Sequence, residues 1–223
     1  VFDNLRKVIS WTLPTNAGEA GTVVTALLLG LSLPISPVQI LWVNLITAVT
    51  LGLALAFEPT EPGTMERLPR ARSAPLLTGE LVWHVLFVGL LFVAAVFGLY
   101  SYAIDRGYPV ALAQTLSMNM LVILEIFHLF FIRNIYSTSL TWSAVRGTQA
   151  VWTCLAIVVA GQFLVTYLPP AQRILGTAAV SFADGLLMFG IGVLFFAIIE
   201  VEKQLRMSLR QRGATIPDSP NQE

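Results

Sequence analysis

Two acidic residues stand inside apolar stretches of the sequence, and each has a polar neighbour at helical spacing. Glu19 follows Asn16 by three residues, and His128 follows Glu125 at the same spacing. Residues three or four apart lie on one face of a helix. Ionisable groups at membrane depth are costly and mark sites for ions or substrates, so Asn16, Glu19 and Glu125 are candidate cation ligands. The alternative for each carboxyl group is a protonated form that hydrogen-bonds to a neighbouring helix.

Neutral oxygen ligands occur in a third stretch, LWVNLITAVTLG, which covers residues 41–52. Asn44 and Thr47 are three residues apart, and Ala48 points in nearly the same direction. Amide and hydroxyl oxygens bind cations without adding charge. Small polar side chains also commonly form hydrogen bonds between membrane helices. This stretch alone therefore leaves both an ion site and helix packing open.

The two histidines carry a weaker signal. His128 is expected to pair with Glu125 or to lie near the membrane interface. His84 is expected at the interface, near the inner end of its span.

The elements that must position these residues are membrane-spanning helices. Apolar residues make up 56% of the chain and charged residues 12%, against about 25% charged in soluble domains. Mean hydropathy is +0.75. A helix needs about 20 mostly apolar residues to cross a bilayer. The segments that meet this requirement are 9–31, 36–57, 81–104, 112–132, 149–168 and 181–201.

The expected fold is an all-α membrane bundle of six transmembrane helices, since the segments lack the alternation of a membrane barrel. The bundle would occupy residues 1–212, and residues 213–223 would form a disordered cytoplasmic tail. With a cytoplasmic N-terminus, all of the 13 Lys and Arg except Arg106 and Arg173 would lie inside. The positive-inside rule therefore places both termini in the cytoplasm.

Charge and motifs exclude several classes of function. The formal net charge is zero, which argues against a nucleic-acid partner and leaves the lipid bilayer as the expected surroundings. Cys154 is the single cysteine, so no disulfide forms within the chain. No phosphate-binding glycine loop, Ser/His/Asp arrangement or HExxH motif occurs. The chain opens at Val1 as if within a helix, and we expect it to be the C-terminal piece of a longer protein.

With these residues in view, the chain resembles the C-terminal transmembrane region of P-type cation-transporting ATPases, and most closely the calcium-pump-like (type II) branch. TNAGE is similar to the family pattern SN-x-GE. The run LPISPVQILWVNLITAVTLGLALAFEPTEPGTMERLPR resembles PxQxLWxNLxTD…PALALGxEPPExxxMxxPPR. VFDNLRKVI resembles the fifth transmembrane helix, LVILEIFHLF the eighth, and VEKQLR the C-terminal end. The expected spans would then be helices five to ten of ten.

The resemblance implies that a transported cation is bound by Asn16, Glu19, Asn44, Thr47 and Glu125. It also implies a partner, namely the missing N-terminal part of the same pump, with helices one to four and the cytoplasmic domains. Mg-ATP and the phosphorylated aspartate would belong to that part. This fragment would then have no cofactor of its own and could not hydrolyse ATP alone. The expected location is a bacterial plasma membrane.

Ala48 departs from the family pattern, which usually has an aspartate after NLxT. In the family that aspartate bridges two ion sites. Divalent cations favour several charged oxygens, so the remaining ligands suit one calcium, another divalent ion, a monovalent cation or protons. Two other classes stay open: a six-helix secondary transporter or channel, and a transport-degenerate pump relative with a structural role.

Overall fold

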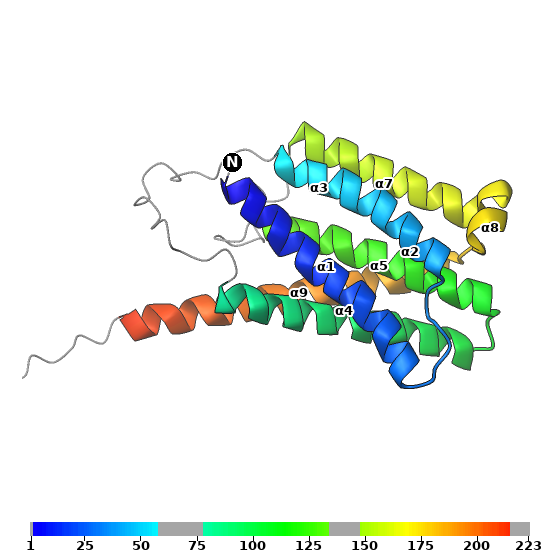
Figure 1. The fold of residues 1–223 in the computed structure, drawn as a ribbon, viewed down its shortest axis with the longest axis horizontal. Coiled ribbons are helices and arrows are strands. Elements are labelled where there is room, and N and C mark those ends of the chain that lie inside the picture. The colour runs from blue at the N-terminus through cyan, green and yellow to red at the C-terminus, as the bar shows by residue number, and fades with distance from the viewer. Residues whose placement is uncertain (1, 58–77, 134–147, 215–223) are drawn as a thin grey trace, which may run out of the picture.

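The protein is helical throughout the part of the chain that the structure describes. A computed structural model describes residues 2–57, 78–133 and 148–214, and these ranges contain helices and short connections but no strand. Figure 1 shows long helices packed side by side along one direction. The all-α membrane bundle predicted from the sequence is confirmed.

The long helices follow the predicted spans closely. The segment from residue 37 to 56 is one continuous helical rod with a change of winding in its middle. The elements are α1 (Phe2–Leu28), α2 (Pro37–Val43), η1 (Asn44–Ala48), α3 (Val49–Ala56), α4 (Gly79–Asp105), α5 (Val110–Arg133), α7 (Gln149–Tyr167), α8 (Pro169–Leu175) and α9 (Phe182–Ala214).

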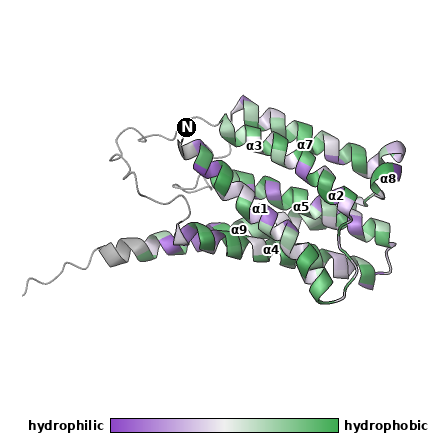
Figure 2. Cartoon of the chain, viewed as in Figure 1, coloured by the Kyte–Doolittle hydropathy of each residue, from purple (hydrophilic) through white to green (hydrophobic). Residues whose placement is uncertain are grey.

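Five helical segments of the described residues are long and apolar enough to cross a membrane. They are 37–56, 79–105, 110–133, 149–167 and 182–209. The helix α1 is not among them, although it has 27 residues. It carries Pro14, Asn16 and Glu19 in its middle, and Figure 2 shows hydrophilic positions there. The sixth span, 9–31, therefore stays a prediction.

Local sequence signals explain where several helices begin. Ser36 caps α2 through a capping box with Gln39, and Pro37 stands in the first turn, where its missing N–H costs nothing. Thr78 and Thr148 cap α4 and α7 in the same way, each accepting a hydrogen bond from a backbone N–H three residues on. These caps define the ends from which the long helices enter the bundle.

The helix α9 runs further than the sequence predicted. It continues past the expected end of its span to Ala214, and the disordered tail proposed for residues 213–223 stays a prediction. Ion pairs one turn apart support this extension: Lys203 lies 2.7 Å from Glu200, and Arg206 lies 2.8 Å from Glu202. Residues 215–223 lie outside the described part of the chain.

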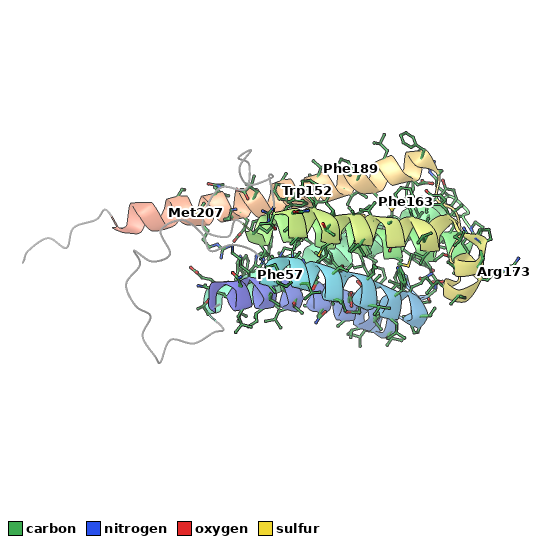
Figure 3. All side chains as sticks on the ribbon, turned by 90° about the horizontal axis from the view of Figure 1, so that it is seen from above. Phe57, Trp152, Phe163, Arg173, Phe189 and Met207 are labelled. Carbon is green, nitrogen blue, oxygen red and sulfur yellow. The ribbon has the colours of Figure 1, made fainter. Side chains whose placement is uncertain are left out.

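The helix α5 is the centre of the bundle. In its apolar window 78% of the residues are buried, against 28–33% in the other four candidate spans. The helices α4 and α9 pack against α5, and α1 packs against α4. Figure 3 shows α9 on one side of the bundle and α1 and α3 on the other. Side chains that point inward from α5 are therefore the ones that several helices can reach.

Close contact between α1 and α4 depends on glycine. A Cβ atom added to Gly18 would lie 2.5 Å from Cβ of Phe92, and one added to Gly21 would lie 2.9 Å from a methyl group of Val93. Small residues at such contacts let membrane helices approach closely. The packing fixes α1 beside the core and so fixes the height of Glu19.

Candidate cation site

A π-helical turn interrupts the rod between Pro37 and Ala56. The turn covers Asn44–Ala48 and contains Asn44 and Thr47, two of the three neutral ligands expected from the sequence. Single π turns inside α-helices are rare and occur frequently at functional sites. The hydroxyl of Thr47 donates to the carbonyl oxygen of Val43 at 2.8 Å, and that of Thr50 donates to the carbonyl oxygen of Ile46. These bonds orient the two threonine side chains against their own helix.

Glu19 and Asn44 join α1 to the π turn. Asn44 Nδ2 donates to Glu19 Oε2 at 2.7 Å and also to the carbonyl oxygen of Ile40 at 3.2 Å. Glu19 is buried, with 7% of its surface exposed. Since both amide hydrogens of Asn44 are used, its amide oxygen is the atom left for another partner.

Glu125 on α5 completes the group. Its carboxyl group interacts with the hydroxyl of Thr47 and with the carboxyl group of Glu19. Trp11 helps to fix this position, because its Nε1 donates to the backbone oxygen of Glu125 at 3.2 Å. Glu19, Asn44, Thr47 and Glu125 thus meet in one place, although they come from three separate parts of the chain.

One oxygen in this group has no partner. Glu125 Oε2 is fully buried and accepts no hydrogen bond from the described residues. Burying a polar atom without a partner is costly, and burying a charge without a partner is more so. An unpartnered carboxylate oxygen beside a second carboxylate and two neutral oxygens is a set of donors that a cation would satisfy.

Asn16 is not brought into this group. It lies one turn before Glu19 on α1 but is exposed, and the described residues show no hydrogen bond from it to the other four. Ala48, in the π turn, is exposed as well. Asn16 and Ala48 are therefore both accessible in the described part of the chain.

The donor set suits a hard cation. In the described ranges no three His, Cys, Asp or Glu side chains gather in one place, so the group consists of two carboxylates, an amide and a hydroxyl. Oxygen donors of this kind suit calcium, magnesium, manganese and similar ions, whereas zinc and copper prefer imidazole and thiolate ligands.

The two histidines differ from the sequence expectation. His84 and His128 are both buried, and their Nε2 atoms lie 3.0 Å apart. Among the described residues His128 therefore pairs with His84 and not with Glu125, and His84 is buried between helices. Phe131 stacks on both rings. The pair was missed because its members are 44 residues apart in the sequence. The spacing of residues within one helix does not predict a contact between two helices.

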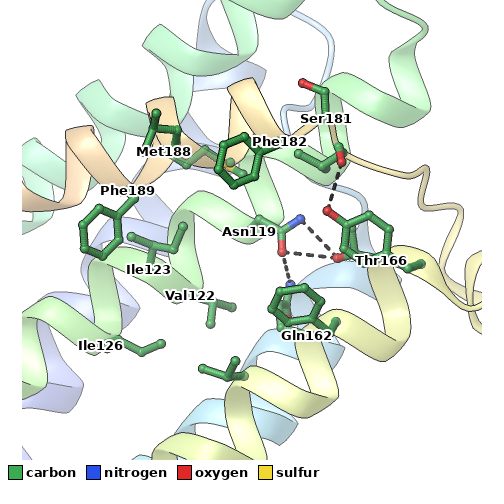
Figure 4. Close-up of a pocket in the computed structure, with 16 residues that line it drawn as sticks. Asn119, Val122, Ile123, Ile126, Gln162, Thr166, Ser181, Phe182, Met188 and Phe189 are labelled. Atoms are coloured by element: carbon green, nitrogen blue, oxygen red, sulfur yellow. Dashed lines mark hydrogen bonds between the residues drawn. The ribbon is translucent and has the colours of Figure 1, made fainter.

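A second polar cluster lies on another face of α5. Gln162 Nε2 donates to Asn119 Oδ1 at 2.9 Å, and Thr166 is hydrogen-bonded to Asn119 at 3.3 Å. Trp42 Nε1 donates to Gln162 Oε1 at 3.1 Å, which connects the cluster to α2. Figure 4 shows the bonds among Asn119, Gln162 and Thr166. All members are neutral, so this cluster cannot balance the charge of an ion.

Comparison with known proteins gives a consistent set of matches. Residues 32–205 match the family described as "Cation transporting ATPase, C-terminus". The chain is 41% identical over 209 residues to "Probable cation-transporting ATPase F" of Mycobacterium tuberculosis, covering 92% of this chain and 22% of the relative.

Two further relatives show the same pattern. "Cation-transporting ATPase pma1" of Synechocystis is 36% identical over 162 residues, covering 72% of this chain and 18% of the relative. "Calcium-transporting ATPase" of Bacillus subtilis is 30% identical over 195 residues, covering 87% of this chain and 22% of the relative. The chain therefore spans about a fifth of the length of the curated relatives it matches.

Proposed function

The chain belongs to the family of cation-transporting ATPase C-termini, and we propose that Glu19, Asn44, Thr47 and Glu125 bind the cation that its full-length parent transports. The observation that carries the proposal is the buried, unpartnered Oε2 of Glu125 beside Glu19. Ionisable groups inside membrane helices usually mark the path of an ion or substrate.

The two carboxylates would attract the cation, and the oxygens of Asn44 and Thr47 would set the geometry of its coordination. Two ionised carboxylates buried side by side repel each other, and a cation between them would remove that repulsion. Asn44 would turn its amide oxygen toward the ion, because its Nδ2 is held by Glu19 and Ile40. Thr47 would contribute its hydroxyl oxygen from the same π turn. A helix whose winding changes at the site can adjust these oxygens without moving its ends.

The rest of the site would come from the rest of the pump. Asn16 and Ala48 are exposed in the described part of the chain, and we infer that helices one to four of the parent cover them and add ligands. Asn16 would then join the site in the complete protein. Mg-ATP would bind to the cytoplasmic domains of the same parent. The parent would lie in a bacterial plasma membrane with both ends of this region in the cytoplasm.

Ala48 limits the charge that the site offers. With alanine at this position the ligands proposed in this chain include two carboxylates, Glu19 and Glu125. Since divalent ions favour several charged oxygens, this set of ligands suits the binding of one divalent cation better than the binding of two. The secondary-transporter and structural alternatives lack support from the family match, which joins the chain to ATPases.

The proposal is tested in the full-length parent protein. Its ATPase activity is measured in lipid vesicles across calcium, manganese, magnesium, sodium and potassium, and one of these ions is expected to stimulate it. Glu19→Gln should raise the concentration of that ion required for half-stimulation. Glu202→Gln, which changes a partly exposed carboxylate paired with Arg206 near the end of α9, is the matched control. Stimulation by none of the ions would contradict the proposal.

A further inference from the structure

A crevice lies between α7 and α9, with α5 as its floor. Its volume is about 500 Å³, and Figure 4 shows the side chains that line it. The floor is buried: Val122 of α5 and Met188 of α9 are almost inaccessible. Phe163 of α7 and Phe189 of α9 stand at its rim and are exposed. The crevice is distinct from the cation site, which lies among α1, η1 and α5.

The floor of the crevice offers little to a polar ligand. Three polar side chains that line the crevice, Asn119 of α5 with Gln162 and Thr166 of α7, bond to one another at 2.9–3.3 Å. The two others are also paired: the hydroxyl of Tyr167 donates to the carbonyl oxygen of Val180, and that of Ser181 donates to Asp184. None of their buried atoms is left without a partner in the described part of the chain. Because these groups are already paired, the surface that remains is apolar, and water has few partners there.

The rim of the crevice opens on the surface of membrane-spanning helices, where lipid is expected. Phe163 is 62% exposed and Leu186 62%, and both belong to helices that qualify as membrane spans. The crevice lies near the end of the bundle at which α7 finishes and α9 begins, with Tyr167 and Phe182 among its lining residues. Exposed apolar side chains on membrane helices face acyl chains. The described part of the chain leaves the opening uncovered, so lipid from this leaflet would have direct access to it.

We propose that the crevice between α7 and α9 binds one acyl chain of a bilayer phospholipid from the leaflet on the side of the α7–α9 connection. Its volume falls within the range of roughly 300–1,000 Å³ that small-molecule sites occupy. A second transmembrane helix does not fit, because such a helix is about 10 Å wide and about 30 Å long. A polar ligand would find no free partners on the floor.

Two glycines of α9 provide a matched pair of variants. Gly185 lines the crevice, and a Cβ atom added there meets no atom within 4 Å. A larger side chain at this position would therefore extend into the crevice without displacing a neighbour. Gly190 lies on the same helix, has the same open surroundings and does not line the crevice. Gly185→Trp should fill the site, whereas Gly190→Trp should leave it open.

The test uses the full-length parent protein in bilayers that contain phosphatidylcholine with a photoreactive diazirine in its acyl chain. After irradiation, labelled positions are mapped by mass spectrometry. Labelling of Val159 and Leu186, which line the crevice, is expected to exceed that of Leu194, an exposed position on α9 outside it. Gly185→Trp should reduce crevice labelling several-fold, and Gly190→Trp should not change it.

Three results would overturn the proposal. Crevice labelling no stronger than that of Leu194 would mean that the lipid contact is nonspecific or that another part of the parent covers the opening. Unchanged labelling in Gly185→Trp would place the lipid elsewhere. Failure of the smaller variant Gly185→Leu to fold would show that the crevice is not open. Photolabelling needs no cation transport, so its outcome is independent of the proposed cation site.

Discussion

The bundle buries two polar clusters against α5, and they differ in one physical respect. The first holds Glu19 and Glu125 with Asn44 and Thr47, and one of its carboxyl oxygens has no partner among the described residues. The second consists of neutral side chains centred on Asn119, and its members are paired with each other. Both clusters join helices that are distant in sequence. The difference is that the first contains two carboxyl groups, and a buried oxygen of one of them has no partner among the described residues.

That difference separates a site from a structural contact. A fully paired neutral cluster gains nothing from a ligand and is expected to hold helices together, with a modest contribution of about 0.6 kcal/mol for an average hydrogen bond in a membrane protein. An unbalanced charged cluster is costly until a positive charge enters. The same reasoning predicts opposite phenotypes for substitutions in the two places.

The largest effect on function is expected from Glu125→Gln. This change removes a charged ligand but keeps the size of the side chain. The cation concentration needed for half-stimulation of ATPase activity should rise by about tenfold or more, since tenfold corresponds to about 1.4 kcal/mol. The thermal stability of the protein in detergent should not fall, because Oε2 of Glu125 accepts no hydrogen bond from the described residues that the change could break. A loss of stability without a change in cation dependence would assign Glu125 to packing.

Asn119→Leu should give the reverse pattern. It leaves Gln162 and Thr166 without their shared partner, which costs about 1–3 kcal/mol for an unsatisfied buried group. The unfolding temperature measured by differential scanning fluorimetry should fall, while the cation dependence of ATPase activity stays unchanged. If cation dependence shifts as strongly as in Glu125→Gln, the two clusters do not differ in the way proposed.

Ala48→Asp tests the difference between the two clusters by adding a carboxylate beside the first one. Ala48 is exposed in the π turn beside Thr47, so an aspartate there can enter the site without displacing a buried neighbour. A third carboxylate should favour divalent over monovalent cations, by a smaller factor than the loss of Glu125. The measurement is the ratio of half-stimulating concentrations for the activating ion and a competing ion of different charge. An unchanged ratio would place position 48 outside the site.

The smallest effect is expected from Trp42→Phe. Trp42 Nε1 donates a hydrogen bond to Gln162, and this bond connects α2 to the neutral cluster. Its loss should cost about 0.6 kcal/mol, near the average for such bonds, and should lower the unfolding temperature slightly. Cation dependence should remain that of the wild type. A large change in cation dependence would mean that the neutral cluster sets the position of the π turn.

The sequence predicts the helices well because apolar length is a local property. The predicted span 36–57 corresponds to helix from residue 37 to 56, and 112–132 to Val110–Arg133. The continuation of α9 to Ala214 was missed because its last turns are polar and depend on side-chain pairs such as Glu202 with Arg206. Apolarity marks only the part of a helix that lies in lipid, so it does not predict the full length of the helix.

The candidate site was predictable only in part. Glu19 and Glu125 attract notice by themselves, because charge inside an apolar run is rare. Asn44 and Thr47 gained their assignment from the resemblance to pump motifs, and the structure then brings them beside the two carboxylates. The exposure of Asn16 depends on what covers α1, which spacing within one helix does not reveal.

The central claim is that the Glu19 and Glu125 pair carries the charge that binds the transported cation. The most direct test is cation-dependent phosphorylation of the full-length protein from ATP, compared between the wild type and the double variant Glu19→Gln/Glu125→Gln. The wild type should form phosphoenzyme in response to its activating cation, and the double variant should lose that response while remaining folded. A double variant with the cation dependence of the wild type would contradict the account.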